Sequence, residues 1–154
     1  MGEHRAFVRW ELLGGDFPKG RYSREHTWRF DGGVTVPASS SPSVVPLPYS
    51  NAANVDPEEA FVASIASCHL LTFLDLARRA GFQIDSYEDD AIGVMAKNDA
   101  GVRWVSSVTL RPKIAYRGEA PSPERTRELH EQAHHHCFIA NSVKTEIRVA
   151  EPEL

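Results

Sequence analysis

An apolar segment with helix signals at both ends, residues 60–74, constrains the fold of this chain most strongly. Before it, Asp56 suits an N-cap, and Glu59 suits the third helical position of a capping box. Pro57 between them suits the first helical position. After it, Gly81 follows two arginines, as at a helix C-terminus. The whole stretch is predicted to be one helix, which at 1.5 Å per residue is roughly 36 Å long.

Apolar side chains occupy nearly the whole circumference of this predicted helix. A helix of that kind must be buried on most of its sides. Several of its residues are small enough to let another backbone come close: Ala60, Ala63, Ser64, Ala66 and Ser67. A chain of 154 residues has little material to enclose so long a helix. We therefore predict a homodimer, in which a second subunit supplies the missing cover.

The rest of the chain predicts mainly strands and one further helix. Alternating or apolar runs are expected to be strands at Phe7–Leu12, His26–Phe30, Val34–Val36, Ala91–Lys97, Arg103–Leu110, Lys113–Tyr116 and 143–149. Ser122-Pro123-Glu124 is expected to open a helix that runs to about His136. The runs Ala91–Lys97 and Arg103–Leu110, separated by Asp99-Ala100-Gly101, are expected to form a β-hairpin. The proline-rich stretch 37–57 is expected to be a loop. This order favours an α+β fold over repeated βαβ units, in a single domain spanning 1–154.

Composition narrows the classes of partner. The formal net charge is −4, so there is no electrostatic case for binding nucleic acid or an anionic membrane. The first residues carry charges throughout, unlike a secretory signal. The longest apolar stretch contains Ser, Cys, His and Thr, and we expect it to be too short and too polar to span a bilayer. We predict a soluble, cytoplasmic protein.

The chain has two cysteines, one in each predicted helix region. Without a leader sequence, a redox, metal or incidental role is favoured over a secreted disulfide framework. Cys68 lies over three turns inside its helix, where the helix dipole has faded and apolar burial raises a thiol pKa. A reactive Cys68 would therefore need a cation from outside its helix. Cys137, at a helix C-terminus, is the better second partner, and an inert core thiol remains the alternative for Cys68.

Two neighbouring features leave alternatives open. Glu58 lies ~15 Å along the helix from Cys68. To influence a thiol it would have to act through an intermediary such as an arginine, or on the thiol of the other subunit; otherwise it only complements the helix dipole.

His130 and His134 share one helix face and, with Cys137, could hold zinc, although no CxxC or HExxH context accompanies them. A Cys68–His69 hydrolase is disfavoured because adjacent helical residues point about 100° apart. The run His134–His136 has no mechanistic explanation.

Three motifs together resemble the OsmC/Ohr family, the osmotically inducible and organic-hydroperoxide-resistance proteins. They are Asp56-Pro57-Glu58-Glu59, Ala66-Ser67-Cys68-His69, and the stretch from His136 to Val143 (HCFIANSV). The likeness spans nearly the whole chain. Within the family, the chain resembles a subgroup with a longer N-terminal portion, marked here by residues 22–28. It implies an α+β, OsmC-like, intertwined homodimer, with long buried central helices packed against antiparallel sheets.

The resemblance also implies an activity in oxidative or osmotic stress defence. Characterised members of the family are thiol-dependent peroxidases that prefer organic or fatty-acid hydroperoxides. By this likeness Cys68 is the peroxidatic cysteine and Cys137 the resolving one, and the two form a disulfide. An external dithiol, of the lipoyl type by family precedent, then reduces it. We expect no cofactor and no metal. The alternative is a metal-binding or small-molecule-binding stress protein without peroxidase turnover.

The likeness assigns roles to two further residues. Glu58 matches the family's helix-start glutamate, which orients an arginine against the reactive thiolate. The location of that arginine varies between subgroups, and this chain has none between Val34 and Asp56. Arg24 fits the N-terminal location best, and Arg21 is the reserve choice. Apolar side chains that could favour an apolar substrate are Phe61, Leu71, Phe138, Val44 and Leu47.

Overall fold

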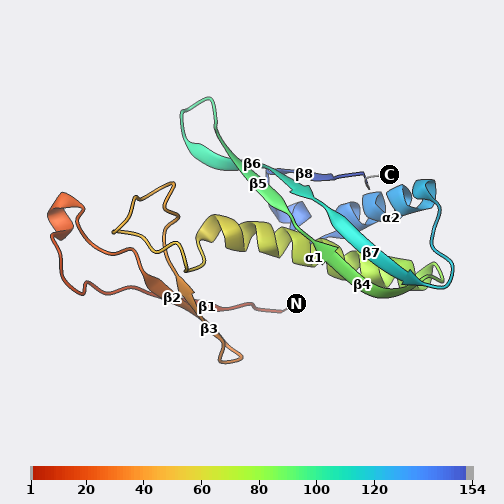
Figure 1. Ribbon diagram of the computed structural model, residues 1–154, viewed down its shortest axis with the longest axis horizontal. Coiled ribbons are helices and arrows are strands. Elements are labelled where there is room, and N and C mark those ends of the chain that lie inside the picture. The colour runs from red at the N-terminus through yellow and green to blue at the C-terminus, as the bar shows by residue number, and fades with distance from the viewer. Residues whose placement is uncertain (1, 152–154) are drawn as a thin grey trace. The chain divides into compact units, whose positions relative to one another are not determined.

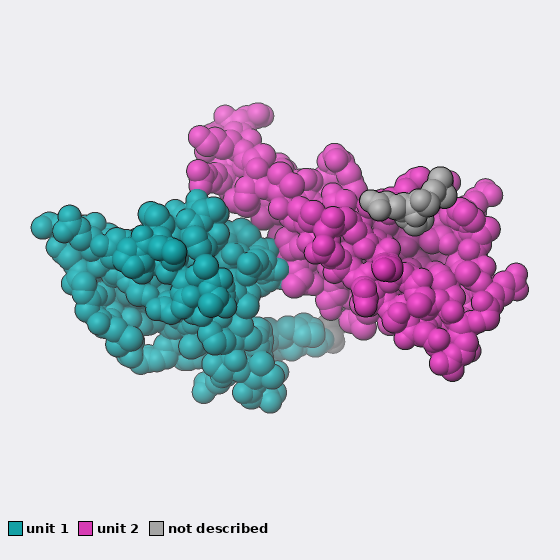
Figure 2. Space-filling model, viewed as in Figure 1, with its two compact units in different colours: residues 1–60 teal, residues 61–154 magenta. Residues whose placement is uncertain are grey.

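A computed structural model describes residues 2–151 of the chain. Two compact units are present, residues 1–60 and residues 61–154, drawn in teal and magenta in Figure 2. Helix α1 (Pro57–Arg79) begins in the first unit and continues into the second. The order of helices and strands agrees with the predicted α+β class (Figure 1).

The first unit contains a three-stranded antiparallel sheet in the order β1-β2-β3. Its strands are β1 (Ala6–Arg9), β2 (His26–Phe30) and β3 (Thr35–Ala38), with a short 3-10 helix, η1 (Phe17–Lys19), between the first two. The predicted strand at residues 26–30 is confirmed, and its two neighbours are displaced by a few residues. Gly33 turns the chain from β2 into β3 with a φ of 94°, a conformation that favours glycine.

Helix α1 has the two ends that its sequence predicts. The backbone N–H of Glu59 donates to Asp56 Oδ1 at 2.8 Å, and the Glu59 carboxylate accepts from the Asp56 N–H at 3.2 Å, which completes a capping box. At the other end, Gly81 has a φ of 90° and its N–H donates to the carbonyl of Arg78. The N–H of Phe82 donates to Ala77, so the helix closes in a Schellman motif.

Burial of α1 within its own chain is limited to one stripe. The fully buried residues repeat every fourth position: Ile65, His69, Phe73 and Ala77. Leu71, on another side, is 64% exposed. This chain alone therefore does not bury the helix on most of its sides. By length and composition alone, α1 could cross a membrane, with a mean hydropathy of 1.7 over 18 residues, so the exclusion based on segment length was too strict.

The second unit holds two small sheets and a second helix. Strands β4 (Gln83–Asp89) and β7 (Pro112–Arg117) form one sheet, and β5 (Ile92–Lys97), β6 (Arg103–Leu110) and β8 (Glu146–Val149) form the other. The helix is α2 (Pro123–His136), which Ser122 caps by accepting from the Arg125 N–H, and a 3-10 turn, η2 (Ala140–Ser142), follows. The predicted β5–β6 hairpin and the second helix are confirmed.

Two features of these sheets differ from the sequence-based expectation. Strand β4 was not predicted, because its sequence is mostly polar and a bulge between Ile84 and Ser86 interrupts the alternation of its side chains. Strand β8 pairs with β6 in the parallel direction, so the prediction of antiparallel sheets is wrong for this pair. The chain reaches β8 through α2, which gives it the crossover that a parallel pair requires.

Two apolar clusters form the core of the second unit. In one, Phe73 and Ala77 of α1 pack with Leu129 and Ala133 of α2, against side chains from β4 and β7. In the other, Ile65 of α1 packs with two buried residues of β6, Val108 and Leu110, and with side chains from β8. Helix α1 is therefore held in the second unit by α2 at one level and by β6 at another.

Candidate active site

The two thiols of the chain lie together in the second unit. Cys68 is half-buried on α1, and Cys137 is buried at the C-cap of α2. Both are free thiols, and Cys68 is close enough to Cys137 to raise its pKa. Two cysteines that are distant in the sequence are thus neighbours in the fold, as formation of a disulfide between them needs.

Burial and the neighbouring thiol act on Cys137 in the same direction. Burial of the side chain, followed by the neighbouring Cys68 thiol, raises the pKa of Cys137 to about 11. The backbone N–H of Ala140 donates to the Cys137 sulfur at 3.4 Å and opposes this rise only in part. Cys137 is therefore a protonated thiol at neutral pH. Since the thiolate is the nucleophile, this environment suits Cys137 to a resolving role rather than to first attack.

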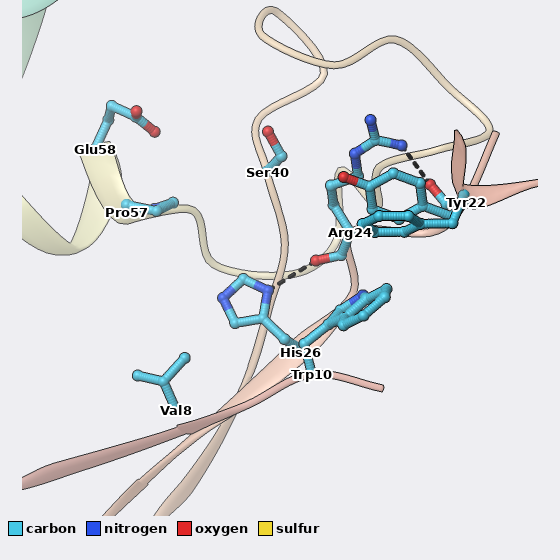
Figure 3. A pocket seen from close by; sticks show the side chains of 9 residues that line it. Val8, Trp10, Tyr22, Arg24, His26, Ser40, Pro57 and Glu58 are labelled. Atoms are coloured by element: carbon cyan, nitrogen blue, oxygen red, sulfur yellow. Dashed lines mark hydrogen bonds between the residues drawn. The ribbon is translucent and has the colours of Figure 1, made fainter. Parts of the chain in front are cut away.

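A separate cavity of about 510 Å³ lies in the first unit (Figure 3). It is lined by Val8, Trp10, Phe17, Tyr22, Arg24, His26, Ser40, Pro57 and Glu58. Three of these are aromatic and pack on one another, with ring centroids 4.6 to 5.9 Å apart. The wall is thus apolar and aromatic with a few charged or polar groups, which is the usual composition of a small-molecule site.

Arg24 is held in this cavity by its own neighbourhood. Its Nη1 donates to the carbonyl oxygens of Gly20, at 2.8 Å, and of Tyr22, and its guanidinium carbon lies 3.6 Å from the centroid of the Tyr22 ring (Figure 3). Its backbone N–H donates to Tyr49 in the loop before α1. These contacts restrict the guanidinium to one region, so its position costs little further conformational entropy.

Glu58 and Arg24 line the same cavity, but Arg21 does not. Glu58 is half-buried in the first turn of α1. Within residues 2–151, no ion pair joins it to Arg24. Arg21 is exposed, and its backbone forms a bridge with Asp16. Of the two arginines proposed from the sequence, Arg24 is the one that faces the cavity with the glutamate.

His26 belongs to this cavity and was not predicted. Its Nδ1 donates to the carbonyl of Arg24 at 2.7 Å, and its Nε2 accepts from the indole N–H of Trp28 at 3.1 Å, so both ring nitrogens are used. In the structure, half-buried and exposed residues alternate from Tyr22 to Trp28. This alternation places Tyr22, Arg24 and His26 on the same side of the chain.

The histidines do not form the zinc arrangement considered from the sequence. His130 is buried, and its Nδ1 is hydrogen-bonded to Nε2 of His69 at 2.9 Å. The run from His134 to His136 is exposed. In the part of the chain that the structure describes, no group of three or more His, Cys, Asp or Glu side chains could hold a metal ion. His69 faces α2, where it is hydrogen-bonded to His130.

The apolar side chains expected to favour an apolar substrate do not line the cavity. Phe138 is 83% exposed, and Leu47 and Val44 are also exposed in the loop before α1. Phe61 packs instead against the second apolar cluster. The aromatic residues that do line the cavity come from the N-terminal segment and were missed, because each is isolated among polar neighbours in the sequence.

Solved structures with the same fold cover almost the whole chain. An OsmC-like protein of unknown function from Vibrio cholerae O1 biovar eltor is 47% identical, with a TM-score of 0.93 over 97% of this chain and 99% of that one. An organic hydroperoxide resistance protein from Elizabethkingia anophelis is 17% identical, with a TM-score of 0.72 over 97% and 93% of the two chains. One from Bacillus subtilis is 20% identical, with a TM-score of 0.64 over 97% and 98%.

Comparison of the sequence itself leads to the same fold. Among curated proteins no match was found. The sequence model of the OsmC-like protein family matches residues 50–151, a range that contains Glu58, Cys68 and Cys137. With this match and the 47% identity over nearly full length, the chain belongs to the OsmC-like protein family.

Proposed function

We propose that this protein is a thiol-dependent peroxidase that reduces organic hydroperoxides, including those of fatty acids, in oxidative or osmotic stress. One observation carries the proposal: Cys68 and Cys137 are close enough for Cys68 to raise the pKa of Cys137, which is held protonated. Two solved structures of the same fold are described as organic hydroperoxide resistance proteins, which supports the substrate class.

The chemistry takes two steps on the protein. The Cys68 thiolate attacks the terminal hydroxyl oxygen of the hydroperoxide and the O–O bond breaks, so that Cys68 becomes a sulfenic acid. The alkoxide leaves as the alcohol after taking up the proton that the Cys68 thiol released on ionising. The Cys137 sulfur then attacks Cys68, the S–O bond breaks, and the hydroxyl leaves as water with the thiol proton. An external dithiol, of the lipoyl type, reduces the disulfide by thiol–disulfide exchange.

In this proposal Arg24 and Glu58 supply the charge that Cys68 lacks on its own helix. The guanidinium stabilises the thiolate and the oxygen that gains charge as the O–O bond breaks, and Glu58 orients it. The aromatic walls around Arg24 hold the organic part of the hydroperoxide. The arginine acts on Cys68 of its own chain or of the partner subunit.

We propose that the functional protein is a cytoplasmic homodimer and that its two units form a single OsmC-like domain. The support comes from α1, whose own chain covers one stripe while Leu71 remains 64% exposed. Burying such a side chain contributes about 2 kcal/mol, which favours a second subunit along the helix.

A thiol count tests the peroxidase directly. Reduced protein is mixed with cumene hydroperoxide, its free thiols are titrated, and its intact mass is measured. We expect both thiols to disappear and the mass to fall by about two daltons, as a disulfide requires. Survival of both thiols in excess peroxide would contradict the proposal. The cavity would then favour a small-molecule-binding protein without turnover.

Arg24→Gln is expected to lower the rate constant for reaction with cumene hydroperoxide about 100-fold, because it removes a fixed cation from the developing charge. Arg21→Gln is the matched control and should stay within about twofold, since Arg21 is exposed and lies outside the cavity. Stopped-flow measurement of thiol loss compares the two. The opposite ranking would make Arg21 the active-site arginine.

Leu71→Glu is expected to shift the protein from dimer to monomer, because it places a charge on the apolar face of α1 that a partner would bury. Arg78→Gln, at the exposed polar end of the same helix, is expected to stay dimeric. Light scattering gives the mass in solution. A wild-type mass equal to one chain would overturn the homodimer.

A further inference from the structure

Two buried histidines form a pair to which the proposed mechanism assigns no role. His69 and His130 are 1% and 7% exposed, and Nε2 of His69 lies 2.9 Å from Nδ1 of His130. Their rings are nearly parallel, with centroids 5.2 Å apart. The His130 ring also stacks on Phe73, 4.3 Å between centroids. The pair is therefore fixed both by a hydrogen bond and by packing.

The pair connects the two helices that carry the thiols. His69 directly follows Cys68 on α1, and His130 lies about two helical turns before Cys137 on α2. Throughout residues 2–151, no other hydrogen bond between side chains joins α1 to α2. The remaining contact is the apolar cluster, and hydrophobic contact is not directional. The hydrogen bond is thus the specific element in the alignment of α1 with α2.

The hydrogen bond needs one donor and one acceptor, so at least one of the two imidazoles must be neutral. Burial lowers the pKa of each histidine to about 4, and for His69 the neighbouring His130 and His134 add to the effect. From β4, Tyr87 packs on Phe73 beside the pair, and burial keeps its phenol neutral by raising its pKa. Among the described residues, no carboxylate is a cause of either histidine's shift. At neutral pH the pair is therefore uncharged and intact.

We propose that the His69–His130 hydrogen bond aligns α1 with α2 and thereby sets how readily Cys68 and Cys137 form their disulfide, an inference that rests on the proposed function. The two histidines are positioning residues, because no hydrogen bond joins either of them to a sulfur in the described structure. The chemistry of the disulfide step is unchanged: the hydroxyl of the Cys68 sulfenic acid leaves as water with the proton of the Cys137 thiol. The hydroperoxide remains the oxidant.

The equilibrium between the protein and dithiothreitol measures this alignment without any peroxide. Protein dithiol and oxidised dithiothreitol exchange to protein disulfide and reduced dithiothreitol. The ratio of protein disulfide to protein dithiol, measured at pH 7 and a fixed ratio of oxidised to reduced dithiothreitol, reports the effective concentration of one cysteine thiol at the other. For His69→Leu and His130→Leu we expect this ratio to fall about tenfold, since each leaves the other imidazole unpaired between the helices.

Conservative variants separate the hydrogen bond from the bulk of the ring. His69→Gln places an amide nitrogen near the position of Nε2, and His130→Asn places one near Nδ1, so both should keep the ratio within about threefold. Leu129→Ala is the matched control, because it weakens the same helix contact and leaves the pair intact. It should lower the stability of the protein but leave the ratio within about threefold.

The proposal fails if the leucine variants stay within threefold, if Leu129→Ala lowers the ratio as far as they do, or if wild type forms no Cys68–Cys137 disulfide. If single leucine variants do not fold, the double variant His69→Leu/His130→Leu decides, since it leaves no unpaired imidazole; an unchanged ratio there also overturns the proposal. A normal wild-type ratio without activity toward hydroperoxide would reject the peroxidase and leave the alignment standing.

Discussion

Replacing Cys68 by serine is expected to abolish hydroperoxide reduction, with a loss of ~10³-fold or more in the rate constant, because a serine hydroxyl does not supply a thiolate. The half-buried position of Cys68, away from either helix end, offers no substitute nucleophile nearby except Cys137. That thiol is held protonated, with its pKa raised to about 11 by burial and by Cys68. A stopped-flow assay with cumene hydroperoxide and a count of remaining thiols measures the loss.

Cys137→Ser is the matched variant and separates attack from resolution. It should still react once, with a gain of one oxygen in the intact mass, because Cys68 forms a sulfenic acid that no neighbouring thiol resolves. Turnover with a dithiol should become slow and sensitive to further oxidation of Cys68. If Cys68→Ser keeps activity and Cys137→Ser loses it, the two cysteines have exchanged roles.

Acid is expected to destabilise the protein through the buried His69–His130 pair. The pKa of each imidazole is lowered from 6.5 to about 4 in the folded protein, mainly by burial. The unfolded chain therefore binds more protons than the folded one between these values, and stability falls as the pH decreases from 6.5 to about 4. The loss amounts to at most ~3 kcal/mol for each imidazole, and above pH 6.5 the pair's contribution is fully present.

Urea unfolding at a series of pH values between 4 and 7.5 measures this effect. In the double variant His69→Leu/His130→Leu, the free energy of unfolding should depend clearly less on pH over that range, since the variant lacks both titrating groups. Leu129→Ala should lower the free energy of unfolding by the same amount at every pH, because it removes only apolar contact. Carboxylates titrate equally in all three proteins and cancel in the comparison. Equal slopes for wild type and double variant would contradict the assignment.

Helix boundaries followed from local sequence because their causes are local. The capping box of α1 uses residues three positions apart, and its Schellman end needs only a glycine that adopts a positive φ. The hairpin between β5 and β6 likewise depends on the turn after Lys97. Strand β4 escaped prediction because its cause is not local: it is held by β7, across a bulge that breaks its alternation.

The candidate site divides in the same way. The sequence indicated which residue types were present, namely two cysteines, a helix-start glutamate and an N-terminal arginine. It did not indicate that His130 pairs with His69 rather than with His134, since this depends on α2 packing against α1. Nor did it indicate the aromatic cavity around Arg24, whose walls come from isolated residues brought together by the first unit.

By itself, then, the sequence determined the helices, the hairpin, the α+β class and the presence of two cysteines, because capping, turns and chemical identity act within a few positions of the chain. Tertiary structure alone decided the parallel pairing of β8, the single buried stripe of α1, the meeting of Cys68 with Cys137 and the His69–His130 bond. Each of these joins residues far apart in the chain, where contact depends on how whole elements pack and not on local preference.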